Sequence, residues 1–135
     1  MKYFLFFLFL ISKNIYPFKI EVVDIIDKKA FIFIAVFDHE EGFPYDGEKS
    51  VFQWKGTPKE VKKGISTNLP DGNYAIVVFQ DIDENNHLTR WFFGKPREPY
   101  GLFKAIEKPK KKPNFLKFST KISHDQILKI KLWEP

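Results

Sequence analysis

The sequence predicts an all-β protein, and the expected architecture is an immunoglobulin-like antiparallel β-sandwich of about seven strands. Three observations support this prediction. The chain has 135 residues, 16 of them Phe, and bulky aromatic and β-branched side chains are enriched in strands. Short apolar or alternating runs recur between polar turns. No stretch sustains the 3.6-residue apolar period of an amphipathic helix, and TPKEVKKG (57–64) offers one helical turn at most.

The first twelve residues, MKYFLFFLFLIS, have the pattern of a secretory signal peptide. One lysine precedes nine apolar residues (3–11) and then a serine. Nine residues are too few to cross a bilayer as a helix, which needs about 20. The alternative is an ordinary first strand, but the run lacks period-2 alternation. We therefore expect a signal peptide within residues 1–18, a single domain at 19–135, export, and no transmembrane span in the mature form.

The expected strands follow in order along the chain. Residues 19–26 (KIEVVDII) and 30–38 (AFIFIAVFD) flank a short polar turn, which predicts a hairpin. The second of these runs is apolar without alternation, which predicts a central strand covered on both faces. In the last strand, 126–133, apolar residues alternate with lysines, which predicts a half-buried strand at an open face or an edge. The other expected strands are 51–56, 62–67, 73–81 and 114–122.

Charge and cysteine content exclude several classes of site. Cysteine is absent, which excludes disulfides, thiolate zinc sites and cysteine catalysis. The formal charge is +5, and much of it lies in the runs 55–64 and 107–113 (EKPKKKP). A solvated, proline-bounded loop is the first interpretation of the second run, and a specific anion site is the alternative. We expect no nucleic-acid binding, because the aromatics are not interleaved with basic residues as a stacking platform requires.

Three motifs follow one another along the chain: LPDGNYAIVVFQDIDENNHL (69–88), FFGKPREPYG (92–101) and KPNFLKFS (112–119). Together they resemble domain-of-unknown-function family 2141, a family of small exported bacterial proteins. The resemblance covers the C-terminal half most clearly. It implies a signal-bearing β-sandwich of unknown biochemical role, and it implies no reaction.

The chain departs from that family pattern at three places. Thr89 and Arg90 stand where the family loop usually ends in a second acid. Asn86 replaces a glycine inside the loop, and asparagine tolerates a positive φ. Leu102 and Phe103 replace a Phe-Ser pair. The missing acid weakens the case for a metal-binding loop in this chain.

A polar loop follows the strongest predicted strand. Asp81, Asp83 and Asn85 alternate as calcium ligands do, and the carbonyl of His87 would serve as a backbone ligand. The loop has no bidentate acid of its own, so Glu98 is the expected distant donor. The alternative is that the Asp and Asn side chains cap a turn at the end of the strand by accepting backbone N–H groups.

The segment WFFGKPREPYG (91–101) also has two interpretations. As a ligand platform it would offer rigid aromatics with charged groups at the rim, suited to a sugar or a peptide. The candidate ligand-binding residues are Trp91, Arg97, Glu98 and Tyr100. As a structural element it would be a packed loop whose aromatics cover one end of the sandwich.

The sequence thus predicts an exported, non-enzymatic binding or accessory module of the cell envelope. Its ligand is unknown and would be an envelope or extracellular carbohydrate or peptide. One alternative is a Ca²⁺-dependent version of the same module, in which the ion orders residues 81–90. A second alternative is a small hydrolase using Asp81, Asp83 and Glu98, for which no nucleophile or acid pairing is recognisable. The histidines give no catalytic signal.

Overall fold

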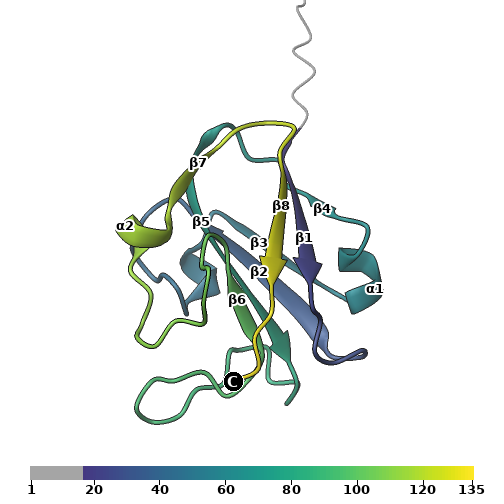
Figure 1. Cartoon of the computed structure of the whole chain (residues 1–135), viewed down its shortest axis with the longest axis vertical. Helices are drawn as coiled ribbons and strands as arrows, with labels where there is room; N and C mark the ends of the chain where they lie inside the picture. The colour runs from purple at the N-terminus through teal and green to yellow at the C-terminus, as the bar shows by residue number, and fades with distance from the viewer. Residues whose placement is uncertain (1–16) are drawn as a thin grey trace, which may run out of the picture.

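Two sheets pack face to face, with a pair of one-turn helices and a 3₁₀ turn at the edges (Figure 1). The structure, a computed structural model, describes residues 17–135. The expected signal segment lies outside the described residues, except for Pro17 and Phe18. The strands are β1 (Lys19–Val23), β2 (Phe31–Phe37), β3 (Phe52–Gly56), β4 (Ile65–Ser66), β5 (Gly72–Asp81), β6 (Tyr100–Leu102), β7 (Thr120–Ile122) and β8 (Ile127–Lys131); the helices are η1 (Gly47–Lys49), α1 (Pro58–Val61) and α2 (Phe115–Phe118).

The sheet topology confirms the predicted β-sandwich and corrects two details. One sheet has the order β4-β1-β8, and the other has the order β3-β2-β5-β6 with β7 also paired to β5. Strands β1 and β8 pair in parallel, whereas the other strand pairs are antiparallel. The predicted hairpin of residues 19–38 is wrong, because β1 and β2 belong to different sheets. The connection 24–30 therefore carries the chain from one layer to the other.

Gln80 holds this connection in place from the end of β5. Its side chain is fully buried. Its Oε1 accepts the backbone N–H groups of Ile26 (3.0 Å) and Asp27 (2.9 Å), and its Nε2 donates to the carbonyls of Asp27 (2.8 Å) and Ala30 (3.3 Å). The amide thus makes four hydrogen bonds to one turn, which satisfies the turn's backbone where strand pairing cannot.

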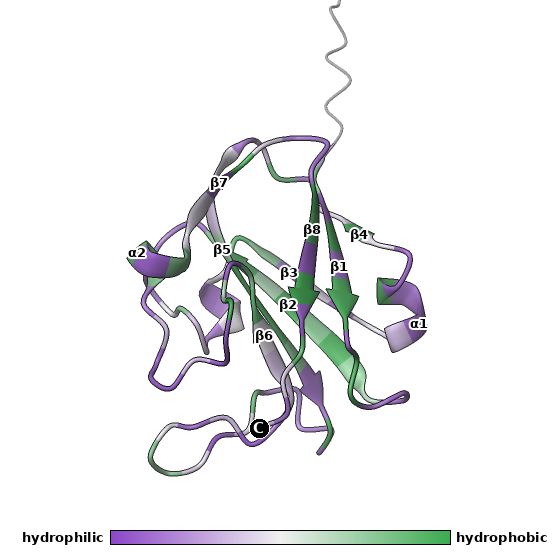
Figure 2. Ribbon diagram, in the orientation of Figure 1, coloured by the Kyte–Doolittle hydropathy of each residue, from purple (hydrophilic) through white to green (hydrophobic). Residues whose placement is uncertain are grey.

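The main core lies between the two sheets and consists of the inward-facing residues of each strand. Strands β1, β2 and β8 contribute alternate side chains. Figure 2 shows β2 as hydrophobic along its length and β8 as a mixture of hydrophobic and hydrophilic residues. Phe18 is also fully buried in this core, and its carbonyl accepts the N–H of Thr67 (3.1 Å). Each fully buried side chain of this size contributes about 1.5–3 kcal/mol. The folded unit therefore includes Phe18 as well as the strands that follow it.

A second apolar cluster covers part of the outer face of the five-stranded sheet. Phe37, Ala75 and Val77 of the sheet pack with Phe43 from the loop after β2 and with Phe115 of α2. Residues 114–122 were expected to form one strand, but Asn114 caps α2 by accepting the N–H groups of the following turn. This helix and the loop after β2 cover one half of the outer face. The other half stays accessible and carries the groove described below.

None of the helices within residues 17–135 is long and apolar enough to cross a membrane. Helix α1 confirms the single helical turn expected at 57–64, and Thr57 and Glu60 form its capping box. Strand β6 begins at Tyr100, inside the segment 91–101 that was expected to be a loop.

Candidate functional site

The polar loop after β5 is held by buried carboxylates. Asp81 is 2% exposed, and its carboxylate accepts the backbone N–H groups of Asn85 (3.2 Å) and Asn86 (2.8 Å). Asn85 in turn accepts the N–H of His87 (2.9 Å) and donates to the hydroxyl of Thr89 (2.7 Å). These bonds match the capping interpretation of Asp81 and Asn85, and they leave the His87 side chain exposed.

Glu98 closes the same loop from the far side. It is 3% exposed and accepts the backbone N–H groups of Ile82 (2.9 Å), Asp83 (3.3 Å) and Thr89 (2.9 Å). Burial raises the pKa of Glu98, because the charged form loses hydration. The hydroxyl of Thr89 donates to Asp83 and lowers the pKa of Asp83. One buried carboxylate therefore joins the start and the end of the loop.

Asp81, Asp83 and Glu98, three of the five residues predicted as calcium ligands, lie close together. One carboxylate oxygen from each lies within 4.8 Å of the others. Two oxygens bound to one Ca²⁺ at 2.3–2.6 Å lie at most about 5 Å apart, so the observed limit of 4.8 Å is compatible with a shared ion. Each carboxylate oxygen has two lone pairs, so one that accepts an N–H group can also bind a cation. The arrangement fits a cation held by three acids.

The aromatic loop that precedes β6 projects into solvent. Phe92 is 99% exposed, and Trp91 and Phe93 are also exposed. Trp91 stacks with Phe93 at a centroid distance of 6.2 Å, and the guanidinium of Arg97 lies 4.2 Å from the Trp91 ring. The prediction that the aromatics of this loop cover one end of the sandwich is therefore wrong for Trp91, Phe92 and Phe93.

The four predicted ligand-binding residues do not form one surface. Trp91 and Arg97 are exposed together, as a ligand platform requires. Tyr100 is buried at the base of a hollow, where its hydroxyl donates to the carbonyl of Pro109 (3.3 Å). Glu98 is not a rim residue, because it is buried against the backbone of the polar loop. The predicted position of Glu98 at the rim of a ligand site is therefore wrong.

A hollow of about 730 Å³ lies on the outer face of the five-stranded sheet. Its base is formed by Val77 of β5 and by Tyr100 and Leu102 of β6. Its walls come from three separate loops: Pro44 and Tyr45 after β2, residues 108–113 after β6, and, after β5, Leu88, Arg90, Phe93, Gly94, Lys95 and Pro96. Figure 1 shows the two longest of these loops on the same side of β6.

A second hollow of about 580 Å³ adjoins the first. The two share Pro44, Tyr45, Val77 and Leu88. From these residues the second hollow continues over the stacked rings of Phe33 and Phe79, which lie 4.9 Å apart, toward β3. We call the combined depression the outer-face groove. Local sequence patterns did not predict this groove, because its walls are far apart in the chain, although the lysine run and the aromatic segment that border it are visible in the sequence.

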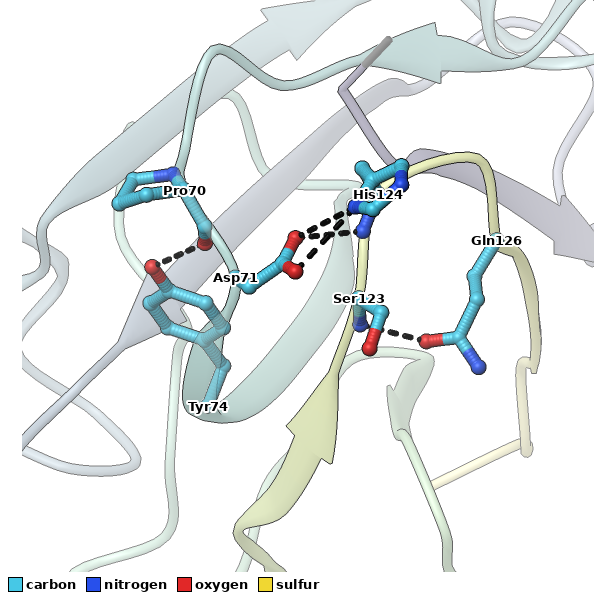
Figure 3. Close-up of polar contacts among 6 residues, drawn as sticks. All are labelled: Pro70, Asp71, Tyr74, Ser123, His124 and Gln126. Atoms are coloured by element: carbon cyan, nitrogen blue, oxygen red, sulfur yellow. Dashed lines mark hydrogen bonds and ion pairs between the residues drawn. The ribbon is translucent and has the colours of Figure 1, made fainter. Parts of the chain in front are cut away.

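A histidine–carboxylate pair lies on another part of the surface, beside the start of β5 (Figure 3). Asp71 accepts the backbone N–H of His124 (2.7 Å) and contacts its ring Nδ1 at 3.2 Å. The N–H of Ser123 donates instead to Gln126 (2.8 Å). Within residues 17–135 no hydroxyl is hydrogen-bonded to the His124 ring. The pair ties the turn between β7 and β8 to the turn before β5.

The fold and the groove define a small two-sheet β-sandwich with a preformed depression on one outer face. The chain belongs to the bacterial family described as "Uncharacterized protein conserved in bacteria (DUF2141)", whose model matches residues 20–130. This match confirms the resemblance carried by the three sequence motifs. No curated protein and no solved structure matches the chain.

Proposed function

We propose that the protein is an exported, non-enzymatic binding module that holds an extended polymer, a carbohydrate or a peptide, in the outer-face groove. The observation that carries this proposal is the continuity of the two hollows through Pro44, Tyr45, Val77 and Leu88. A linear ligand needs a depression that is longer than one residue of the polymer. Two adjoining hollows on one sheet face provide such a path.

The lining of the groove supports binding by a rigid surface. Ligand sites are mostly apolar, with a few polar groups that set orientation. Here strands β5 and β6 provide an apolar base, and Pro44, Pro96 and Tyr45 provide walls of low side-chain entropy. A surface of this kind binds without first having to become ordered, so less of the interaction energy is lost on binding.

The placement of the acids supports a binding role over the hydrolase alternative. Asp81, Asp83 and Glu98 do not line either hollow of the groove. The two buried acids, Asp81 and Glu98, accept backbone N–H groups and thereby hold the loop. A general acid has to reach the substrate within hydrogen-bond distance. The support for export comes from the sequence, where a lysine precedes nine apolar residues.

Affinity measurements with aromatic variants test the proposal. The intact protein is titrated with dextran, polygalacturonate, polyproline and polyglutamate. We expect binding to at least one of these probes, and we expect Tyr45→Ala and Phe93→Ala to weaken it, because both side chains line the groove. Phe92→Ala is the matched control, since Phe92 is the exposed neighbour of Phe93 and does not line the groove. Equal losses in all three variants, or no binding to any probe, would contradict the proposal.

A second candidate is the Ca²⁺-dependent form of this module, in which the ion orders residues 81–90. The convergence of Asp81, Asp83 and Glu98 within 4.8 Å favours it. A cation would also offset the cost of burying two carboxylates in one site. The loop borders the groove at Leu88 and Arg90, so the ion would fix one wall of the ligand site.

Thermal unfolding with and without Ca²⁺ tests the second candidate. Ca²⁺ at one hundred times its dissociation constant should stabilise the fold by about 2.7 kcal/mol. Asp83→Asn should abolish the upward shift of the melting temperature. Glu84→Gln should retain it, because Glu84 is an adjacent exposed acid outside the cluster. A melting temperature that millimolar Ca²⁺ leaves unchanged would exclude this form.

A further inference from the structure

The lysine run 108–112 lies along one wall of the outer-face groove together with cations from another loop. The basic side chains that line this half are Arg90, Lys95, Lys108, Lys110, Lys111 and Lys112. No Asp or Glu lines it. Among the described residues, none of the six takes part in an ion pair. Figure 2 shows the part of the loop between β6 and α2 that precedes α2 as mainly hydrophilic.

This half of the groove carries six cations and no acid, a larger positive charge than the net +5 of the whole chain. The chain has 22 Lys and Arg and 17 Asp and Glu. Six of the cations line this half, which leaves 16 against the 17 acids. The rest of the molecule is therefore close to neutral. A depression lined by one sign of charge focuses the field and raises the local concentration of oppositely charged ligands.

Contacts to the groove position the basic residues. The carbonyl of Pro109 accepts the hydroxyl of Tyr100 (3.3 Å), which attaches the lysine run to β6. The guanidinium of Arg90 lies 4.1 Å from the Tyr45 ring, and Lys112 Nζ lies 6.0 Å from the same ring. The run is thus bordered by Pro113 and α2 on one side and held to the sheet on the other. These contacts place cations above an apolar base rather than on an unconstrained loop.

We infer that the groove binds an acidic polysaccharide, with its anionic groups on the lysine wall and its sugar rings on the apolar base. This inference rests on the proposed binding function and specifies its ligand class. The apolar faces of sugar rings would pack against Val77, Leu102 and the Tyr45 ring. Carboxylate groups of the polysaccharide would pair with the lysine and arginine side chains of the wall.

At the β6 end of the groove, the backbone disfavours a peptide. Extended peptides commonly bind by adding a strand to a free sheet edge. Next to the groove, Tyr100 of β6 exchanges two backbone hydrogen bonds with Trp133, of 3.1 Å and 2.8 Å. The edge of β6 is therefore already paired at that residue. A polysaccharide needs no such edge, because it binds through ring faces and charged groups.

A comparison of an acidic polysaccharide, a neutral polysaccharide and an acidic polypeptide tests the inference. The intact protein is titrated at low and high salt with polygalacturonate, dextran and polyglutamate. Polygalacturonate should bind more tightly than the other two, and its affinity should fall with salt. Replacing lysines 108, 110, 111 and 112 with Gln should weaken it about tenfold, since each exposed ionic contact contributes only part of a kcal/mol. Replacing lysines 59, 62, 63 and 129 with Gln is the control, which changes the charge equally at exposed sites outside the groove.

Each contrary result identifies what has failed. Equal losses in the two quadruple variants would overturn the inference, because the attraction would then be non-specific. Polyglutamate binding as tightly as polygalacturonate, with the same loss, would assign an acidic peptide instead. Equal binding of dextran and polygalacturonate would overturn the acidic ligand and leave the groove as a polysaccharide site. If no polymer binds at all, the proposed function fails together with this inference.

Discussion

Replacing the buried Gln80 should destabilise the protein more than the loss of any single hydrogen bond would. The Gln80→Leu variant keeps the side chain buried but removes four hydrogen bonds to the turn 24–30. Each bond contributes about 1 kcal/mol net, and a buried group left without a partner costs about 1–3 kcal/mol more. Part of the turn is exposed and would be rehydrated. We therefore expect a loss of about 3–4 kcal/mol in the free energy of unfolding.

Urea unfolding followed by circular dichroism measures this loss. The slope of the free energy against urea should change little, because the surface exposed on unfolding is similar. Gln126→Leu is the control, since the exposed Gln126 accepts one hydrogen bond at a surface turn. It should change stability by less than about 0.5 kcal/mol. A Gln80→Leu loss as small as that of the control would refute the role assigned to Gln80 in joining the two sheets.

Three further predictions concern the packing of the sheets and the loops. Gly101→Ala should lower the free energy of unfolding by about 2–4 kcal/mol, because the added Cβ would lie 2.3 Å from the carbonyl oxygen of Lys131. Urea unfolding measures this loss, and an unchanged midpoint would contradict the close approach of β6 and β8. Glu98→Ala should speed amide exchange at Thr89, whose N–H loses its acceptor, and leave the core of β5 protected; unchanged exchange at Thr89 would contradict the assigned bond. The backbone N–H of His124 lowers the pKa of Asp71, so the ionised carboxylate stabilises the fold at neutral pH, and this contribution should disappear as the pH falls below about 4. The stability difference between wild type and Asp71→Asn should therefore shrink on acidification, and a difference that does not depend on pH would contradict the assignment.

Local sequence patterns predicted the strands where one face is buried. The alternation in β8 placed Leu128 and Ile130 in the core, and the long apolar run of β2 became a strand with neighbours on both sides. These patterns arise from side chains that point alternately to opposite faces of a sheet, so they are visible within a few residues.

Strand partners could not be predicted in the same way. The pairing of β1 with β8 joins segments more than one hundred residues apart, and no local pattern records it. The false hairpin arose because the polar turn 24–30 resembles a hairpin loop, whereas its backbone is satisfied by the distant Gln80. A single glutamine at the end of an apolar run does not reveal such a contact.

The candidate site was predictable only in part. The proximity of Asp81, Asp83 and Glu98 was expected, because calcium-like spacing after a strand directs attention to a distant acid, whereas the metal site itself stays a prediction. The outer-face groove was not predicted, because it forms only when the pairing of β5 with β6 brings the lysine run beside residues 88–96. The lysines were therefore interpreted as a solvated loop.

Amide chemical-shift mapping with a short polygalacturonate oligomer tests the central claim most directly. The method reports, residue by residue, which backbone groups change surroundings when the ligand binds. We predict that the perturbed amides gather at Tyr45, at 88–95 and at 108–112, and that the sheet formed by β4, β1 and β8 stays unperturbed. Perturbations centred on that three-stranded sheet, or none at all at saturating oligomer, would contradict the account.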